Sequence, residues 1–194
     1  MKTHQRLRTL ALGLSLGLAI VTMAPLVMAG SVNAEKTVMV GGAAMYPSKN
    51  IIQNAADSKD HTTLMAALKA AGLVDTLSGA GPFTVFAPTD KAFAALPSGT
   101  VDDLMKPENK AALAKLLTYH VIAGRLTMHD LTKAVEANGG IVDLKTLEGD
   151  SITISKDANR LAISDDKGNV AHITISDVMQ SNGVIFVIDQ VLIP

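Results

Sequence analysis

The side chain with the clearest capacity for chemistry is the imidazole of His120, which directly follows Tyr119. An imidazole titrates near neutral pH and serves as a general acid, general base or metal ligand. Leu113, Leu116 and Leu117 precede it at the spacing of one helix face, so a helix that reaches this far places His120 in an apolar stripe. A buried imidazole and a buried phenol both need hydrogen-bond partners. The pattern favours a structural Tyr-His pair, and direct contact with a ligand stays open as the alternative.

The other histidines lack the spacing of a metal or catalytic site. His61 and His129 fall in the first turns of expected helices and His172 on the polar face of an expected strand, so we expect all three to be solvated. No two histidines have the i, i+4 spacing with a glutamate that a zinc peptidase needs. Asp165 and Asp166 fit a hairpin turn better than a calcium loop, because no distal glutamate follows them at the required place. We therefore expect no metal and no cofactor.

Two further motif matches are weak. Residues 13–17 read Gly-Leu-Ser-Leu-Gly, which fits the nucleophile elbow of serine hydrolases, but they lie in an apolar N-terminal stretch and not between a strand and a helix of a domain. Residues 79–81 begin a G-x-G pattern that Thr84 breaks, and they precede a strand instead of following one. No pair of carboxylates stands out for glycoside chemistry. The sequence predicts no enzyme.

Composition bounds the remaining possibilities. The chain has 194 residues, 48% of them apolar and 18% charged, which predicts one folded domain. It has no cysteine, which excludes disulfides, thiolate zinc sites and cysteine nucleophiles. The 17 basic residues are balanced by 18 acidic ones, so no positive surplus is present to neutralise the phosphates of a nucleic acid.

The N-terminus predicts export. Three basic residues precede an apolar stretch from position 10 to position 29, and Val32-Asn33-Ala34 provides small residues for a signal peptidase. We interpret residues 1–34 as a secretory signal, with an uncleaved membrane anchor as the alternative. Cleavage changes the formal charge from −1 to −4 and leaves no segment that would span a membrane. The mature protein is expected to be secreted or periplasmic.

The elements expected after the signal fall into two halves. Residues 35–48 show no sustained periodicity and are expected to be a mobile leader, and residues 49–194 are expected to form the domain. Helical periodicity and caps dominate the first half, including a helix that begins after Asp60 and a short helix capped by Thr89. The second half shows strand patterns at 141–144, 151–155, 161–164, 170–176 and 184–188. Helices followed by strands predict an α+β fold.

The last of these strands is apolar at every position, which is typical of a strand buried on both faces. Val184-Ile185-Phe186-Val187-Ile188 is therefore expected in the middle of the architecture. Asn182 and Gly183 before it form a turn that sets its register.

Four segments in order resemble the fasciclin domain family. They are Phe83-Thr84-Val85-Phe86-Ala87-Pro88-Thr89-Asp90-Lys91-Ala92-Phe93, Leu117-Thr118-Tyr119-His120-Val121, Gly124-Arg125-Leu126 and Asn182-Gly183-Val184-Ile185-Phe186-Val187-Ile188-Asp189. The resemblance implies a wedge of β-strands packed with short helices and a role in adhesion, and it implies no reaction. The motif residues that it singles out, as structural positions, are Thr84, Phe86, Pro88, Thr89, Asp90, Phe93, Tyr119, His120, Asn182, Gly183, Phe186 and Asp189.

The chain departs from the family pattern at Phe186, where a histidine is usual. A function that needs a polar group there is in doubt, whereas a phenyl ring adds about 1.5 to 3 kcal/mol of apolar burial. Two hypotheses of function follow. The first is an exported, non-enzymatic adhesion module that contacts a cell-surface protein or glycan. The second, which the resemblance also suggests, is a carrier of a carotenoid or lipid in a groove that the leader, with Met39 and Met45, helps to cover.

Overall fold

The computed structural model describes residues 36–158 and 160–194. The expected signal at residues 1–34 and the turn residue Asn159 lie outside the described residues. The described residues belong to one compact unit. No helix among them combines the length and the apolar content that crossing a bilayer requires.

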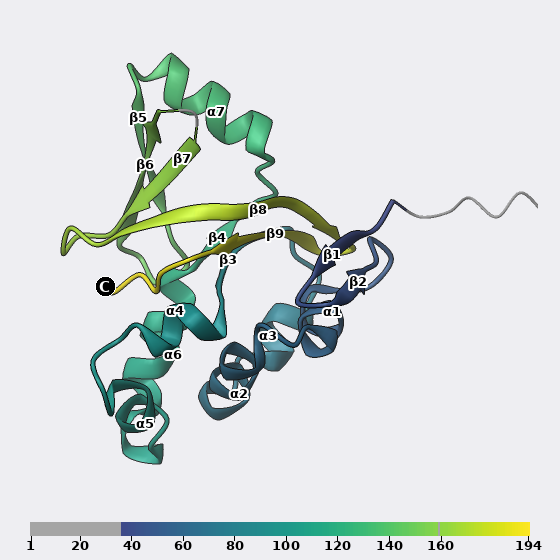
Figure 1. Ribbon diagram of the computed structural model, residues 1–194, viewed down its shortest axis with the longest axis vertical. Coiled ribbons are helices and arrows are strands. Elements are labelled where there is room, and N and C mark those ends of the chain that lie inside the picture. Colours follow the sequence, from purple (N-terminus) through teal and green to yellow (C-terminus); the bar gives the residue numbers. More distant parts are fainter. Residues whose placement is uncertain (1–35, 159) are drawn as a thin grey trace, which may run out of the picture. The chain divides into compact units, whose positions relative to one another are not determined.

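Most of the helices precede most of the strands, as an α+β fold requires (Figure 1). The helices of the described residues are α1 (Ile51–Asp57), α2 (Thr62–Ala71), α3 (Val74–Ser78), α4 (Asp90–Ala94), α5 (Thr100–Leu104), the 3₁₀ helix η1 (Pro107–Asn109), α6 (Lys110–Tyr119) and α7 (Met128–Ala137). The strands are β1 (Val38–Val40), β2 (Ala43–Met45), β3 (Phe83–Pro88), β4 (Val121–Ala123), β5 (Ile141–Lys145), β6 (Ser151–Asp157), β7 (Arg160–Ser164), β8 (Val170–Gln180) and β9 (Gly183–Ile188).

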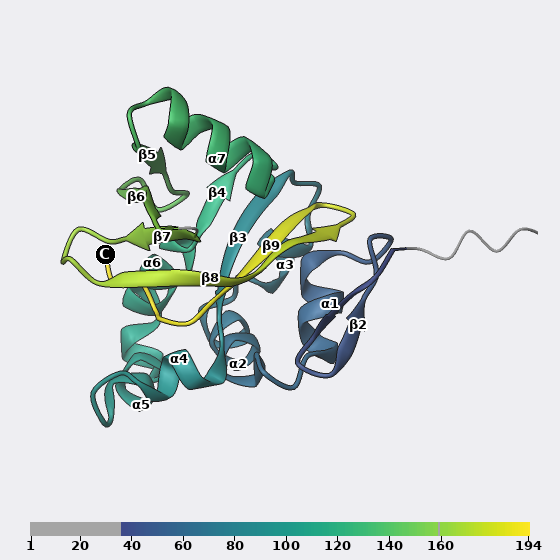
Figure 2. The same cartoon turned by 45° about the horizontal axis from the view of Figure 1, so that its top comes forward.

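Seven strands form one sheet in the order β4-β3-β9-β8-β7-β6-β5. Only the pairing of β3 with β9 is parallel, and the other neighbours are antiparallel. The register of β8 against β9 shifts on both sides of Ile175, and such bulges bend a strand. The long strand β8 can thus pair with β7 at one end and with β9 along the rest (Figures 1 and 2).

Strand β9 lies inside the sheet with β3 on one side and β8 on the other, and all six of its residues are buried. This confirms the central position expected from its unbroken apolar sequence. Its two faces serve different cores. Ile185 and Val187 belong to a helix-side core, and Phe186 and Ile188 belong to a wedge core on the opposite face.

The two cores draw on different elements. The helix-side core contains side chains from α1, α2, α4 and α6, among them Ile51, Leu64, Leu68, Phe93, Leu113 and Leu117. The wedge core joins β6 and β7 to α7 and includes Tyr119, Leu131, Val135, Ile152, Ile154 and Ile163. Each core therefore forms only when segments distant in the sequence meet across the sheet.

The segment expected to be a mobile leader contains regular structure, so that expectation was wrong for residues 38–45. Strands β1 and β2 form a hairpin whose Val40 and Met45 are buried in the helix-side core. The amide of Asn54 in α1 fixes its end, since Asn54 Oδ1 accepts from the Tyr46 amide at 3.0 Å and Nδ2 donates to the Tyr46 carbonyl at 2.8 Å. Strands of three residues are too short to show a period in the sequence, and it is this tertiary packing that orders them.

Candidate functional site

The Tyr119-His120 pair lies inside the protein where α6 ends. His120 is 2% exposed and Tyr119 is fully buried. His120 Nδ1 lies 2.8 Å from the Leu116 carbonyl, and Nε2 lies 3.0 Å from the Leu192 amide. An amide only donates, so Nε2 accepts, and the neutral imidazole carries its proton on Nδ1. Both ring nitrogens are thus committed to the protein's own backbone.

Burial governs the titration of both side chains. It lowers the pKa of His120 to about 4, so the imidazole is neutral at physiological pH. It raises the pKa of Tyr119 to about 12, and the tyrosine hydroxyl donates to the Ser151 carbonyl at 2.9 Å. Neither group reaches solvent, so an effect of this pair on a partner has to act through the structure around it.

His61 is buried as well, and the expectation that it is solvated was wrong. Its exposed fraction is 3%, and burial lowers its pKa. Its Nδ1 lies 2.8 Å from Ser58 Oγ, whereas Nε2 has no hydrogen-bond partner among the described residues. A first-turn histidine normally faces water, but here the start of α2 packs against α4, which supplies its cap.

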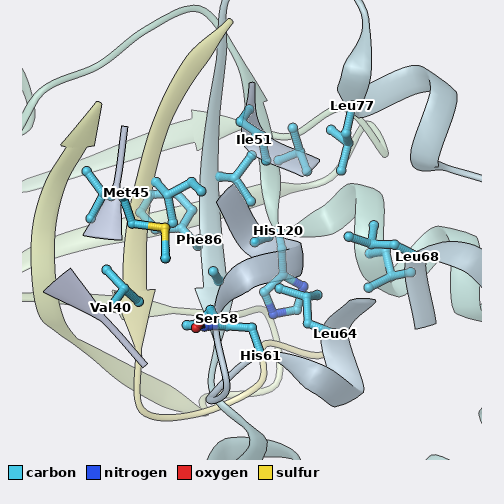
Figure 3. A pocket seen from close by; sticks show the side chains of 17 residues that line it. Val40, Met45, Ile51, Ser58, His61, Leu64, Leu68, Leu77, Phe86 and His120 are labelled. Carbon is cyan, nitrogen blue, oxygen red and sulfur yellow. Dashed lines mark hydrogen bonds between the residues drawn. The ribbon is translucent and has the colours of Figure 1, made fainter. Parts of the chain in front are cut away.

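His61 and His120 line the same internal cavity, together with Ser58 and mostly aliphatic side chains (Figure 3). Val40 and Met45 of the β1-β2 hairpin form part of its wall, while Met39 is 59% exposed. The cavity measures about 30 Å³. At about 10 to 15 Å³ for each water, it has room for roughly two water molecules. A cavity of this size is far too small for a carotenoid or lipid.

Thr84 connects the family's first and third segments. It is fully buried on β3, where its hydroxyl donates to the Gly124 carbonyl at 2.8 Å and accepts from the Leu126 amide at 2.9 Å. Arg125 between them donates to the carbonyls of Gln180 and Ser181. The loop before α7 is thereby fixed to β3 and to the β8-β9 turn.

Asn182 and Gly183 join the same turn to the helices. The Asn182 amide accepts from the Ile51 amide at 3.0 Å and donates to the carbonyls of Leu77 and Gly79, both at 2.8 Å. A Cβ on Gly183 would lie 2.2 Å from the Phe83 carbonyl oxygen, so no larger residue fits at the start of β9. These two residues set how closely β9 approaches β3.

The aromatic motif residues fill the two cores. Phe86 and Phe186 face each other across the parallel β3-β9 pair, with ring centroids 5.6 Å apart and an interplanar angle of 29°. Such offset stacking adds to the burial of both rings. Phe93 of α4 is 5% exposed in the helix-side core. Phe186 is fully buried in the wedge core against the Phe86 ring, a position that suits a phenyl ring.

The remaining motif residues meet at the surface. Because β3 and β9 are parallel, their carboxyl ends lie at the same edge, where Pro88 leads into Thr89 and Asp90, and Ile188 leads into Asp189. A hollow of about 280 Å³ opens there. We call it the acidic hollow, and its lining residues are Asp60, Thr89, Asp90, Lys91, Thr174 and Asp189.

Two carboxylates of the acidic hollow also stabilise the fold. Asp90 accepts from the Thr63 amide at 2.8 Å and from the Thr62 hydroxyl at 2.7 Å, which caps α2 from another helix. Its partial burial raises its pKa, but these hydrogen bonds outweigh that effect and hold the pKa below its usual value. Asp189 accepts from the His172 amide at 2.7 Å. Asp60 makes no such side-chain bond within the described residues and is exposed.

The acidic hollow is suited to recognition through hydrogen bonds. Carboxylate oxygens accept from amines, guanidinium groups and sugar hydroxyls. Among the described residues, no group of three or more histidine, aspartate or glutamate side chains is arranged to hold a metal ion. Asp60 and Thr174 were not predicted as site residues, and no sequence signal could have found them, because α2, β8 and the β3-β9 edge meet only in the fold.

The comparisons with known proteins agree with the motifs. The family model described as the Fasciclin domain matches residues 59–194. This chain belongs to the fasciclin family. Protein sll1483 of Synechocystis is 42% identical over the whole of this chain and 99% of its own length. Immunogenic protein MPT70 of Mycobacterium tuberculosis is 36% identical, over 72% of this chain and 66% of its own.

The fold of this fasciclin domain is shared with a solved structure described as a FAS1 domain pair from the insect cell adhesion molecule fasciclin I. That structure covers 83% of this chain with a TM-score of 0.67, and this chain spans 59% of it. Sequence identity is 22%, so the similarity shows the fold alone. Human periostin, at 33% identity over 70% of this chain, contains the same kind of domain within a longer protein, of which the match covers 15%.

Proposed function

We propose that this fasciclin domain is an exported, non-enzymatic module that binds a cell-surface protein or glycan through its exterior. The main support is that some motif residues are buried in the protein and others lie at its surface. Those with the richest chemistry, Tyr119 and His120, hydrogen-bond to the backbone inside the protein, whereas the ends of β3 and β9 form the acidic hollow on the surface. The fold shared with a cell adhesion molecule is consistent with this role.

The acidic hollow gives the proposal a specific test. Asp60→Lys reverses a charge in the hollow at an exposed residue that caps nothing, so the variant is expected to fold normally. Cells that produce it in place of the wild-type protein are expected to lose surface attachment and aggregation to the extent of a deletion strain. Asp75→Lys makes the same charge change on α3, outside the hollow, and serves as the matched control.

The possible results distinguish the adhesion role from the role of the acidic hollow in it. A deletion strain that attaches and aggregates like the wild type on several surfaces contradicts the adhesion role. A deletion defect that Asp60→Lys does not reproduce contradicts the acidic hollow as the contact. A pull-down from native envelope extract with mass-spectrometric identification then names the partner.

The carrier hypothesis has less support. The β1-β2 hairpin covers an apolar cavity, as that hypothesis requires, but about 30 Å³ is far too small for a pigment or lipid. Absorbance spectra and lipid extraction of protein purified from its own host decide the matter. A coloured or lipid-loaded preparation would support the carrier hypothesis.

A further inference from the structure

Strand β5 ends the seven-stranded sheet, and no strand of residues 36–158 or 160–194 lies along its outer edge (Figure 1). Hydrogen bonds at both ends of the β5-β6 ladder show which residues face that edge. The Lys156 amide donates to the Gly140 carbonyl at 3.3 Å, and the Thr146 amide donates to the Asp150 carbonyl at 2.9 Å. In an antiparallel ladder the bonded residues alternate, so the even-numbered residues of β5 bond to β6.

The odd-numbered residues Ile141, Asp143 and Lys145 therefore direct their backbone N–H and C=O groups to the free edge. Their side chains are also exposed, and Ile141 is 56% exposed. Natural sheets usually protect such an edge with charged side chains, proline, a bulge or a covering segment. Strand β5 has no proline and pairs with β6 without a register shift. Exposed charges of both signs, Asp143 and Lys145, lie along this edge, so it can pair with a strand that brings the opposite charge to each of them.

The order of side chains on β5 is complementary to itself. When a second β5 is placed antiparallel about a two-fold axis at Leu144, Asp143 lies opposite Lys145 of the other copy, and Lys145 lies opposite its Asp143. The odd-numbered residues then exchange backbone hydrogen bonds, as the free edge requires. Opposite charges directly across an antiparallel pair stabilise it, and a two-fold axis forms every contact twice.

The apolar residues support the same register. Ile141 lies opposite position 147 of the other copy, and Leu147 is 39% exposed. Leu147 lies two residues beyond β5 and its amide donates to the Val121 carbonyl of β4 at 2.7 Å, so β4 lies beside this end of the edge and the backbone pairing is confined to residues 143–145. A register centred on Asp143 would instead place two aspartates opposite each other, which is destabilising. A register centred on Lys145 would likewise oppose two lysines, and the register centred on Leu144 is the one that brings each charge opposite its counter-charge.

We propose that this protein forms a two-fold dimer in which β5 of one copy pairs antiparallel with β5 of a second copy, centred on Leu144. The dimer continues the sheet from seven strands to fourteen across two chains. It leaves the acidic hollow outside the contact, because no residue of β5 lines the hollow. A bivalent module with two hollows would bind a surface that presents repeated partners more strongly than one copy does.

Charge exchange tests the proposal directly. Sedimentation equilibrium of the protein purified from its producing cells, over a wide concentration range, is expected to show a monomer-dimer equilibrium. Asp143→Lys and Lys145→Asp each turn two attractive pairs into two repulsive ones, and each is expected to raise the dimer dissociation constant by about tenfold or more. An equimolar mixture of the two variants restores both attractive pairs, as does the double variant.

Two controls keep the result interpretable. Lys133→Asp makes the same kind of charge change at an exposed residue of α7, outside β5, and is expected to leave the dimer unchanged. Asp143 also accepts a hydrogen bond from the Thr153 hydroxyl at 2.7 Å, so the stability of each variant is measured by thermal melting. A protein that stays monomeric at the highest concentrations overturns the proposal. So does a dimer that tolerates both single variants, or a mixture of the variants that fails to associate.

Discussion

Strands β9 and β5 belong to the same sheet but differ in the burial of their side chains and in the pairing of their edges. All six residues of β9 are buried, and its neighbours occupy both edges. Strand β5 alternates exposed with half-buried residues, and one of its edges is unpaired within the part of the chain that the structure describes. The family's motif includes β9 but not β5. The strand whose sequence helps to identify the family is therefore one that builds the interior of the fold, and the proposed contacts use the periphery.

The same division holds within the motif itself. Phe86, Phe186 and His120 are at most 2% exposed, whereas Asp189 is exposed at the surface. Substitutions in the buried group should change stability, and substitutions at the exposed edges should change association.

The largest expected contrast is between Phe186→Ala and Ile141→Ala. Removing the Phe186 ring leaves a cavity beside Phe86 and is expected to lower the free energy of unfolding by about 3 to 5 kcal/mol. Ile141 is exposed, so its truncation is expected to change stability by about 0.5 kcal/mol or less. Urea denaturation at a concentration where the protein is monomeric measures both. Similar losses for the two variants would contradict the comparison.

The next effect is a dependence of stability on pH that comes from His120. Its pKa is about 4 in the folded protein against an ordinary value of 6.5, so between these values the unfolded chain binds more protons. Stability is complete above about pH 6.5 and is lost as the pH falls towards 4, by roughly 3 kcal/mol in total. His61, whose pKa is also lowered, acts in the same direction.

Urea denaturation between pH 7 and pH 4.5 tests this effect against a His120→Asn variant. The variant is expected to be less stable at pH 7 and to lose less stability on acidification. Carboxylates titrate in both proteins, so the difference between the two slopes reports the imidazole. Equal slopes would show that His120 is accessible to protons in the folded state.

A smaller loss of stability is expected from Asp90, which lies at the surface but also caps a helix. Asp90→Ala removes the cap of α2 and is expected to cost about 1 kcal/mol. Asp102→Ala, in the first turn of α5, removes an acidic side chain that makes no capping bond, so its expected cost is smaller. Thermal melting of both variants measures the difference. An Asp90→Ala protein as stable as Asp102→Ala would mean that Asp90 does not cap α2.

The sequence predicted those elements whose formation depends on residues close to one another in the chain. Five successive apolar residues predicted the central position of β9, and Thr127 predicted the start of α7, where it forms a capping box with Asp130. The α+β order and the family were also evident from the sequence. In each case, interactions between residues near one another in the sequence determine the structure.

Long-range contacts explain what the sequence did not predict. The cap of α2 comes from Asp90, 28 residues away from Thr62, so His61 could not be recognised as buried. The β1-β2 hairpin is ordered by Asn54 and by the burial of Met45, which no local periodicity reveals. The acidic hollow likewise combines residues that only the parallel pairing of β3 and β9 brings together.

Amide hydrogen exchange, followed residue by residue, tests the central claim that β9 is sealed inside the sheet while β5 is open. The amides of β9 are expected to exchange only through global unfolding, with a protection free energy equal to that from urea denaturation. In dilute protein, the edge amides of Asp143 and Lys145 are expected to exchange far faster. Exchange of the β9 amides at the rate of the β5 edge, well below the global limit, would contradict the account.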